Sequence, residues 1–273
     1  MKLNDLNKIA ALYNDTETMP LLFIGHGNPI NAITQNEFTV EWNKIGKSLP
    51  GPNAVICISA HWETNGTFVT TMDKPRTIHD FYGFPAELFE VEYKAPGSPY
   101  LARETKKLIA KTSVELDNNW GLDHGCWSVV MHLFPEANIP VIELSLDYTK
   151  QPQWHYELGK ELSFLRNKGI LIIGSGNIVH NLRMISWQNK DGFDWALEAD
   201  RKFKKLILND EYTELIDYKN LGIEVQLAVP TPEHFLPLLY ILGLKEKNES
   251  ISFFNEKTEL GSISMTSLMI NRK

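Results

Sequence analysis

Gly169-Ile170-Leu171-Ile172-Ile173-Gly174 is a short apolar run, rich in β-branched residues, with a glycine at each end. Such a run is typical of a strand buried on both faces, as in a parallel sheet covered by helices. Three similar runs precede it, at Pro20–Ile24, Ala54–Ala60 and Pro140–Ser145. Stretches with helical periodicity lie at 98–112, 126–134, 152–167 and 191–208. We therefore expect an α/β fold with a central mixed, largely parallel sheet flanked by helices.

The rest of the chain extends this pattern without a second domain. Phe235–Leu242 predicts a further helix, Ile251–Asn255 and Ser262–Met269 predict two tail strands, and the first 18 residues are partly helical in pattern. No internal repeat, low-complexity tract or Pro/Gly/Ser-rich linker divides the sequence. Residues 1–273 are therefore expected to form a single domain.

Composition and charge exclude several classes of protein. With 43% hydrophobic and 22% charged residues, the chain is globular rather than disordered or coiled-coil. The net charge of −7 argues against a nucleic-acid partner, because backbone binders present a basic face. No apolar run approaches the roughly 18–20 residues that cross a bilayer, so no membrane partner is expected. The acidic N-terminus does not resemble a signal peptide, and two cysteines cannot build a disulfide framework, so a cytoplasmic location is expected.

Four of the eight histidines occupy the same kind of position in the predicted structure. Each comes where an apolar strand ends or where a turn gives way to a helix: His26, His61, His180 and His234. Ligands of open α/β sheets bind beyond the carboxyl ends of the strands, so these side chains are expected to share one crevice. Imidazole is the commonest metal ligand, and the flanking glycines allow close approach of the backbone. The pattern therefore predicts a metal site.

His124 is a further candidate. Asp123 is a suitable helix N-cap, which would place His124 at a helix N-terminus, where the dipole favours a neutral imidazole. The alternative is a solvated loop histidine. His79 opens an aromatic-rich segment at 79–93 that either lines a pocket or covers the core. The surroundings of His132 favour packing within a helix, and those of His155 favour either packing or exposure at the surface of a helix.

Other chemistries find little support. Cys57 and Cys126 lie far apart and cannot form a zinc finger, and a nucleophilic Cys126–His124 pair is disfavoured because adjacency in sequence does not give reach in space. G-x-S-x-G, G-x-G-x-x-G, P-loop and H-E-x-x-H motifs are all absent. A histidine-rich metal site remains, with Glu63 and Glu233 as neighbouring carboxylates. Zinc with three ligands and ferrous iron with two histidines and a carboxylate both fit these ligand types.

Five motifs together resemble those of a known family. They are Gly25-His26-Gly27-Asn28-Pro29, Ser59-Ala60-His61-Trp62, Leu122-Asp123-His124-Gly125, Gly174-Ser175-Gly176-Asn177-Ile178-Val179-His180-Asn181-Leu182 and Pro232-Glu233-His234-Phe235-Leu236-Pro237-Leu238. Their order and separations are similar to those of the class III extradiol ring-cleavage dioxygenases, and more narrowly to the branch named for 4,5-DOPA dioxygenase. The resemblance runs from about Pro20 to the C-terminus.

The resemblance implies that residues 1–273 are a single extradiol dioxygenase-like catalytic domain that cleaves a catechol ring beside its two hydroxyls with O₂. It implies one divalent metal per chain, zinc as bound or Fe(II) for ring cleavage. Carried over by motif, His26, His61, His180 and His234 correspond to residues at the metal, and His124 and His180 to catalytic residues. His234 stands where the wider family places a third ligand that is usually glutamate, which leaves the metal open and Glu233 as a reserve ligand. His180 is open as a ligand, a base or both.

The expected partners are a small aromatic catechol and O₂. Trp62, Trp127 and the segment 79–93 offer flat surfaces to such a ring. Arg183, three residues after His180 on an expected helix, either pairs with a substrate carboxylate or forms a surface salt bridge. The alternative function is a zinc-dependent hydrolase, or a metal-binding protein without oxygenase activity, on the same scaffold. The tail strand and the exposed aromatics are compatible with a monomer and with a dimer.

Overall fold

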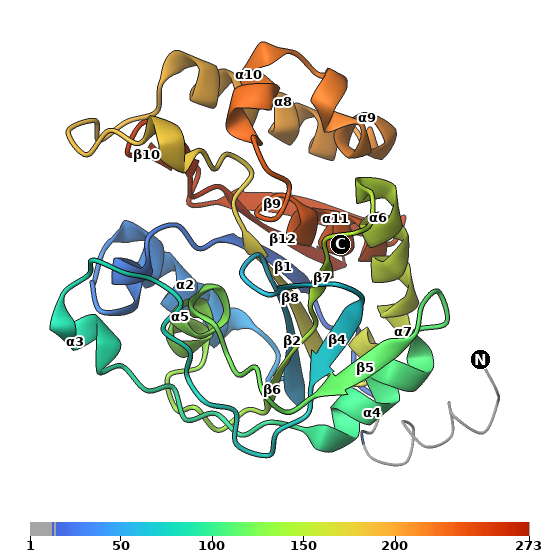
Figure 1. Cartoon of the computed structure of the whole chain (residues 1–273). Coiled ribbons are helices and arrows are strands. Elements are labelled where there is room, and N and C mark those ends of the chain that lie inside the picture. The colour runs from blue at the N-terminus through green and yellow to red at the C-terminus, as the bar shows by residue number, and fades with distance from the viewer. Residues whose placement is uncertain (1–12, 14, 273) are drawn as a thin grey trace.

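A six-stranded sheet forms the centre of the computed structural model, which describes Tyr13 and residues 15–272. Its strand order is β6-β2-β8-β1-β12-β9 (Figure 1). The first four strands are parallel, and β12 runs antiparallel to both β1 and β9. Their bounds are β1 Leu21–Gly25, β2 Ala54–Ser59, β6 Val141–Glu143, β8 Ile170–Gly176, β9 Glu249–Phe254 and β12 Ser267–Arg272. The expected mixed, largely parallel sheet is confirmed.

Helices cover both faces of this sheet. The side chains of successive strand residues point to opposite faces, so Leu21 and Phe23 join one buried cluster while Leu22 and Ile24 join the other. Figure 1 shows α2 and α5 on one side and α6 and α11 on the other. The helices are α2 Glu37–Ser48, α3 Ala86–Phe89, α4 Pro99–Leu108, α5 His124–Leu133, α6 Pro152–Glu161, α7 Ser163–Arg166, α8 Asp194–Leu208, α9 Tyr212–Ile216, α10 Ile223–Ala228 and α11 Leu236–Leu244.

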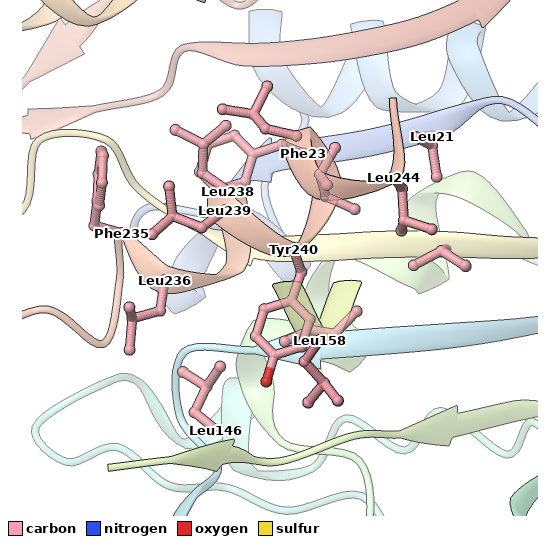
Figure 2. Close-up of a cluster of buried hydrophobic side chains, with 14 of the residues drawn as sticks. Leu21, Phe23, Leu146, Leu158, Phe235, Leu236, Leu238, Leu239, Tyr240 and Leu244 are labelled. Atoms are coloured by element: carbon pink, nitrogen blue, oxygen red, sulfur yellow. The ribbon is translucent and has the colours of Figure 1, made fainter. Parts of the chain in front are cut away.

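The helix α11 is buried on nearly every side. Its sequence is apolar all round, which is typical of a core helix rather than a surface helix. Figure 2 shows side chains of α11 gathered with Leu21 and Phe23 of β1, and Tyr240 of the same helix beside Leu158 of α6. Each such side chain contributes about 1.5–3 kcal/mol when fully buried. The packing fixes α11, and with it the loop that precedes it, against the sheet.

Short elements complete the structure. Three two-stranded sheets pair β3 with β7, β4 with β5 and β10 with β11. These strands are β3 Glu63–Thr64, β4 Thr67–Thr70, β5 Val114–Asp117, β7 Leu146–Asp147, β10 Thr258–Glu259 and β11 Ile263–Ser264, and the 3₁₀ turns are η1 Pro29–Ala32, η2 Leu182–Met184 and η3 Tyr218–Asn220. Within the described residues no helix combines the length and the apolar character that crossing a bilayer requires.

Several predicted boundaries differ from the structure. The helix expected at 152–167 is two helices, because the ladder tightens at Leu162, whose N–H bonds to the Gly159 carbonyl. The tail strand expected at 262–269 is divided between β11 and β12. Arg183 shares no helix with His180, since only the 3₁₀ turn η2 follows that histidine. The helical pattern of the first 18 residues falls largely on 1–12 and 14, outside the described residues.

Candidate metal centre

Three of the predicted site histidines follow adjacent parallel strands. Because β2, β8 and β1 are neighbours, their carboxyl ends lie together at one edge of the sheet. His26 directly follows β1, His61 follows β2 by two residues, and His180 follows β8 by four. The strand-end pattern in the sequence therefore corresponds to a real cluster in space.

Two further histidines reach this edge from helix termini. His124 is the first residue of α5, whose N-cap Asp123 accepts a hydrogen bond from the Cys126 N–H. His234 lies two residues before α11, and its carbonyl accepts a hydrogen bond from the Asn177 N–H at 2.9 Å. At Gly176 a Cβ would stand only 2.1 Å from that carbonyl oxygen, so glycine is required there.

All five histidines line one pocket of about 500 Å³. The ring centres of His26, His61 and His234 form a nearly equilateral triangle with sides of 5.0, 5.0 and 5.3 Å. His180 stacks on His234 at 3.5 Å, with the two rings nearly parallel, and His124 lies 3.9 Å from His61. The pocket thus holds a triangle of imidazoles with a further imidazole on either flank.

An oxygen atom holds the Nδ1 of each imidazole in the triangle. Ser175 Oγ donates its one proton to the Gly125 carbonyl at 2.6 Å, so it accepts from His26 Nδ1–H at 3.0 Å. Carboxylates can only accept, and Asp80 lies 3.2 Å from His61 Nδ1 while Glu233 lies 3.1 Å from His234 Nδ1. All three rings therefore carry their proton on Nδ1 and keep a lone pair on Nε2.

The Nε2 atoms of the triangle are suited to bind a cation. The Nε2 atoms of His26 and His61 are 3.1 Å apart, and two lone pairs at that distance repel unless a proton or a metal lies between them. His234 Nε2 is buried without a hydrogen-bond partner. Among the described residues, two separate groups each have ligand atoms close enough to hold an ion. The first is His26, His61 and His124; the second is His180, Glu233 and His234. The donor set fits a divalent metal bound by imidazole nitrogens.

Burial keeps most of these imidazoles neutral. Desolvation, and then the neighbouring imidazoles, hold the pKa values of His26 and His234 well below the ordinary value. Desolvation also lowers the pKa of His180, to about 3, and that of His124. His61 differs, because Asp80 and other nearby carboxylates outweigh desolvation and raise its pKa. Neutral imidazole is the form that binds metal.

Asp80 is the residue of the site that sequence reasoning missed. Its Oδ2 lies 3.2 Å from His61 Nδ1 and 2.9 Å from His124 Nδ1, and its Oδ1 accepts a hydrogen bond from the His124 backbone N–H. Burial opposes ionisation of Asp80, but the two imidazoles outweigh it and hold the pKa of this carboxyl below its usual range. The signal in the sequence is only its position after His79.

The remaining candidates lie outside the pocket. Glu63 is exposed on β3, and His79 donates from its ring to the Val91 carbonyl. His155 is fully buried beside Tyr240, which agrees with a packing role. Burial raises the pKa of the Cys126 thiol, which opposes a thiolate nucleophile.

Apolar residues form the walls of the pocket. Phe81, Tyr82 and Phe84 contribute from the aromatic segment, and Leu182 and Trp187 contribute from the loop after β8. The expected surfaces at Trp62 and Trp127 are elsewhere. Trp62 stacks on Trp120 at 5.7 Å, and Trp127 is buried with its indole N–H on the Ile78 carbonyl.

Comparisons with known proteins identify the family of this chain. Residues 22–267 match the family described as the catalytic LigB subunit of aromatic ring-opening dioxygenase. A protein of Escherichia coli K12 named 4,5-DOPA dioxygenase extradiol is 44% identical over 257 residues, which cover 92% of this chain and 94% of the relative. A Beta vulgaris protein of the same name is 37% identical, with 89% and 92% covered.

A solved structure extends the likeness to the fold. The crystal structure of an uncharacterized Escherichia coli K12 protein has a TM-score of 0.81 and 40% identity, covering 93% of this chain and all of that one. The fold, the family match and the relatives all lead to one classification. The chain belongs to the class III extradiol dioxygenases of the LigB type, aromatic ring-opening dioxygenases, and is therefore an oxidoreductase.

Proposed function

We propose that this chain is a metal-dependent extradiol dioxygenase that opens the ring of a catechol, a 4,5-DOPA-like compound, and incorporates both atoms of O₂. The observation that supports this most is the triangle of His26, His61 and His234. Each ring has an oxygen atom at its Nδ1, which leaves Nε2 unprotonated, and all three rings line a pocket with aromatic walls.

In this proposal one divalent metal is held by His26, His61 and His234. When bound, it supplies Lewis acidity toward the catechol oxygens and, as ferrous iron, the redox chemistry that O₂ requires. Glu233 is less suited as a ligand, because its Oε1 accepts from His234 Nδ1 and from the Thr231 hydroxyl.

His180 and His124 are proposed as the proton-transfer groups. Burial leaves His180 neutral, so it can accept a proton from a catechol hydroxyl that lies against the His234 ring. His124 has its Nδ1 beside the Asp80 carboxylate, which stabilises the imidazolium formed when His124 Nε2 takes a proton. His180 remains a candidate for a direct ligand as well, and a variant below separates the two roles.

A zinc-dependent hydrolase, or a metal-binding protein without oxygenase activity, is the second candidate. The observation that favours it is the all-nitrogen donor set, since zinc is commonly held by three histidines. Ferrous oxygenases more often include a carboxylate ligand. Zinc-loaded and iron-loaded protein therefore have to be compared directly.

The decisive experiment is anaerobic reconstitution with Fe(II), followed by oxygen uptake and visible absorbance with L-DOPA and a panel of catechols. Protein loaded with Zn(II) is the parallel control. We expect oxygen uptake and a yellow ring-opened semialdehyde only in the iron sample. Protein that holds one metal per chain but consumes no oxygen with any catechol would refute the dioxygenase and favour the second candidate.

Variants test the proposed roles. The double variant His26→Ala/His61→Ala should bind no metal, and full retention of metal would refute the site. His180→Ala should retain metal and lose turnover, whereas loss of metal would make His180 a ligand. His132→Gln is the matched control, because this histidine bonds to the Asn31 carbonyl and does not line the pocket.

We also propose residues 1–273 as one catalytic domain, with a small catechol and O₂ as its substrates. A cytoplasmic location stays a prediction based on the two cysteines, both of which are free and buried.

A further inference from the structure

The pocket wall carries acidic side chains but no strongly basic ones among the described residues. Among the described residues that line the pocket there is no lysine or arginine, and the two acidic residues are Asp80 and Glu259. Asp80 is engaged by two imidazoles. Arg183, considered above as a partner for a substrate carboxylate, is exposed and does not line the pocket. Glu259 is therefore the charged wall residue that is left for a substrate.

The C-terminal hairpin places Glu259 at a defined distance from the histidines. Glu259 pairs with Ile263 across β10 and β11, and Ile263 forms a bridge with His180. His180 and Glu259 are thus the two pairing partners of Ile263, one on either side of it. Two inter-strand spacings of about 5 Å each place the backbones of His180 and Glu259 about 10 Å apart. A catechol with a two-carbon chain measures about 8 Å from hydroxyl oxygen to terminal nitrogen at ordinary bond lengths. A ring beside His180 can therefore extend such a chain to Glu259.

The hairpin is held rigidly against the loop after β8. Its turn uses left-handed backbone at Leu260 and Gly261, with φ of 53° and 77°. The Leu260 carbonyl accepts from the Ser186 N–H, and the Gly261 carbonyl accepts from the Phe193 N–H, both at 2.8 Å. The position of Glu259 is therefore fixed before a ligand binds, which lowers the entropic cost of recognition.

Glu259 forms no ion pair with a lysine, arginine or histidine in the described part of the chain. The charge of Lys257 lies near enough to oppose the effect of burial on Glu259, but the ion pair of Lys257 is with the Glu37 carboxylate. Partial burial of Glu259 raises the pKa of its carboxyl, because desolvation disfavours the charged form. A ligand cation would restore the interaction that burial removes.

We propose that the pocket selects catechols whose side chain ends in an ammonium group, and that Glu259 is the residue that binds this group. The proposal rests on the catechol dioxygenase function proposed above and narrows its substrate class. A substrate carboxylate finds no cation on the described wall. Leu182, Ile185 and Leu260 offer apolar contact to the intervening carbons.

Binding measurements test the proposal independently of turnover. Titration calorimetry with zinc-supplemented protein would compare dopamine, neutral 4-ethylcatechol and anionic 3-(3,4-dihydroxyphenyl)propionate. We expect dopamine to bind most tightly and the propionate most weakly, with about three- to tenfold between dopamine and the neutral compound. The preference should diminish in high salt. Equal affinities, preference for the propionate, or no binding of any of the three would overturn the proposal.

Variants assign the effect to one side chain. Glu259→Gln should remove the advantage of dopamine and leave 4-ethylcatechol unchanged, and Glu259→Lys should shift the preference toward the propionate. Glu256→Gln is the control, because it removes the same charge from the same segment, where the residue is exposed and paired with Lys204. A Glu259→Gln protein that keeps the wild-type order would refute the assignment.

Turnover separates the two proposals. Iron-loaded protein that opens 4-ethylcatechol but treats amine and acid alike would retain the dioxygenase and reject the ammonium subsite. Failure to open any catechol would reject the dioxygenase, while the affinities measured with zinc would still decide the charge preference.

Discussion

Replacement of Asp80 by asparagine should weaken metal binding through the protonation of His61. Asp80 Oδ1 accepts from the His124 backbone N–H at 2.9 Å, so the amide oxygen of an asparagine must remain at that position. The amide NH₂ then lies where Oδ2 was, 3.2 Å from His61 Nδ1 and 2.9 Å from His124 Nδ1. An amide N–H needs an acceptor, so the imidazoles must carry their protons on Nε2 instead.

The expected magnitude follows from this change of tautomer. A proton on His61 Nε2 occupies the lone pair that faces His26 Nε2 at 3.1 Å. Loss of a carboxylate that orients a ligand histidine typically costs 10- to 100-fold in metal affinity, or about 1.4–2.7 kcal/mol. At saturating metal, turnover should fall by about 100-fold or more, because the same change affects His124 as a proton-transfer group.

Chelator competition with Zn(II) gives the affinity, and oxygen uptake at saturating Fe(II) gives the turnover number. Asp73→Asn is the matched control, since Asp73 is exposed on the same segment and lies outside the pocket. Thermal denaturation of the metal-free proteins verifies that both variants are folded. Wild-type affinity and turnover in folded Asp80→Asn would refute the argument from tautomers.

Three further predictions follow from burial and close approach. Burial lowers the pKa of His155 from an ordinary 6.5 to about 4, so the unfolded chain takes up this proton more readily than the folded one. The free energy of unfolding should therefore be highest above pH 6.5 and fall by about 3 kcal/mol toward pH 4. His155→Gln should flatten this part of the pH profile in urea titrations. Gly176→Ala should cost about 1–3 kcal/mol and weaken zinc binding by displacing His234, while Gly51→Ala, which has open space around it, should leave affinity unchanged; equal affinities would contradict the required close approach. Ser175→Ala should lower zinc affinity about tenfold, because it removes the hydroxyl that accepts a hydrogen bond from His26 Nδ1. Unchanged zinc affinity in chelator competition would show that this hydrogen bond does not orient the His26 ring.

The architecture and the cluster of histidines were predictable because both depend on local patterns. Continuous apolar runs mark strands buried on both faces, and parallel neighbours bring their carboxyl ends together. His26, His61 and His180 could therefore be grouped without knowledge of the strand order. His234 could be added because a turn gives way to a helix there, and the family resemblance supplied the expected roles of these residues and of His124. The roles of these residues stay predictions until metal binding and turnover are measured.

The rest depends on tertiary contacts that have no local signature. Asp80 lies in a segment without a helix or strand, and it reaches two histidines only because that segment crosses the start of α5. Ser175 lies beyond the apolar run that predicts the strand, yet it belongs to β8, and its hydroxyl accepts a hydrogen bond from the His26 ring after the neighbouring strand. Glu259 lines the pocket through a two-residue strand that no periodicity could indicate.

The position of β1 in the sheet also determines when the protein can become active during synthesis. β1 is the first strand of the described residues, yet its two sheet neighbours, β8 and β12, come more than 140 residues later in the sequence. The Gly25 N–H, directly before His26, bonds to the Ser267 hydroxyl of β12. A nascent chain that carries the first two proposed ligands therefore lacks the framework that holds them. Pairings this distant form slowly and late, so the metal site is expected to assemble only after β12 has been synthesised.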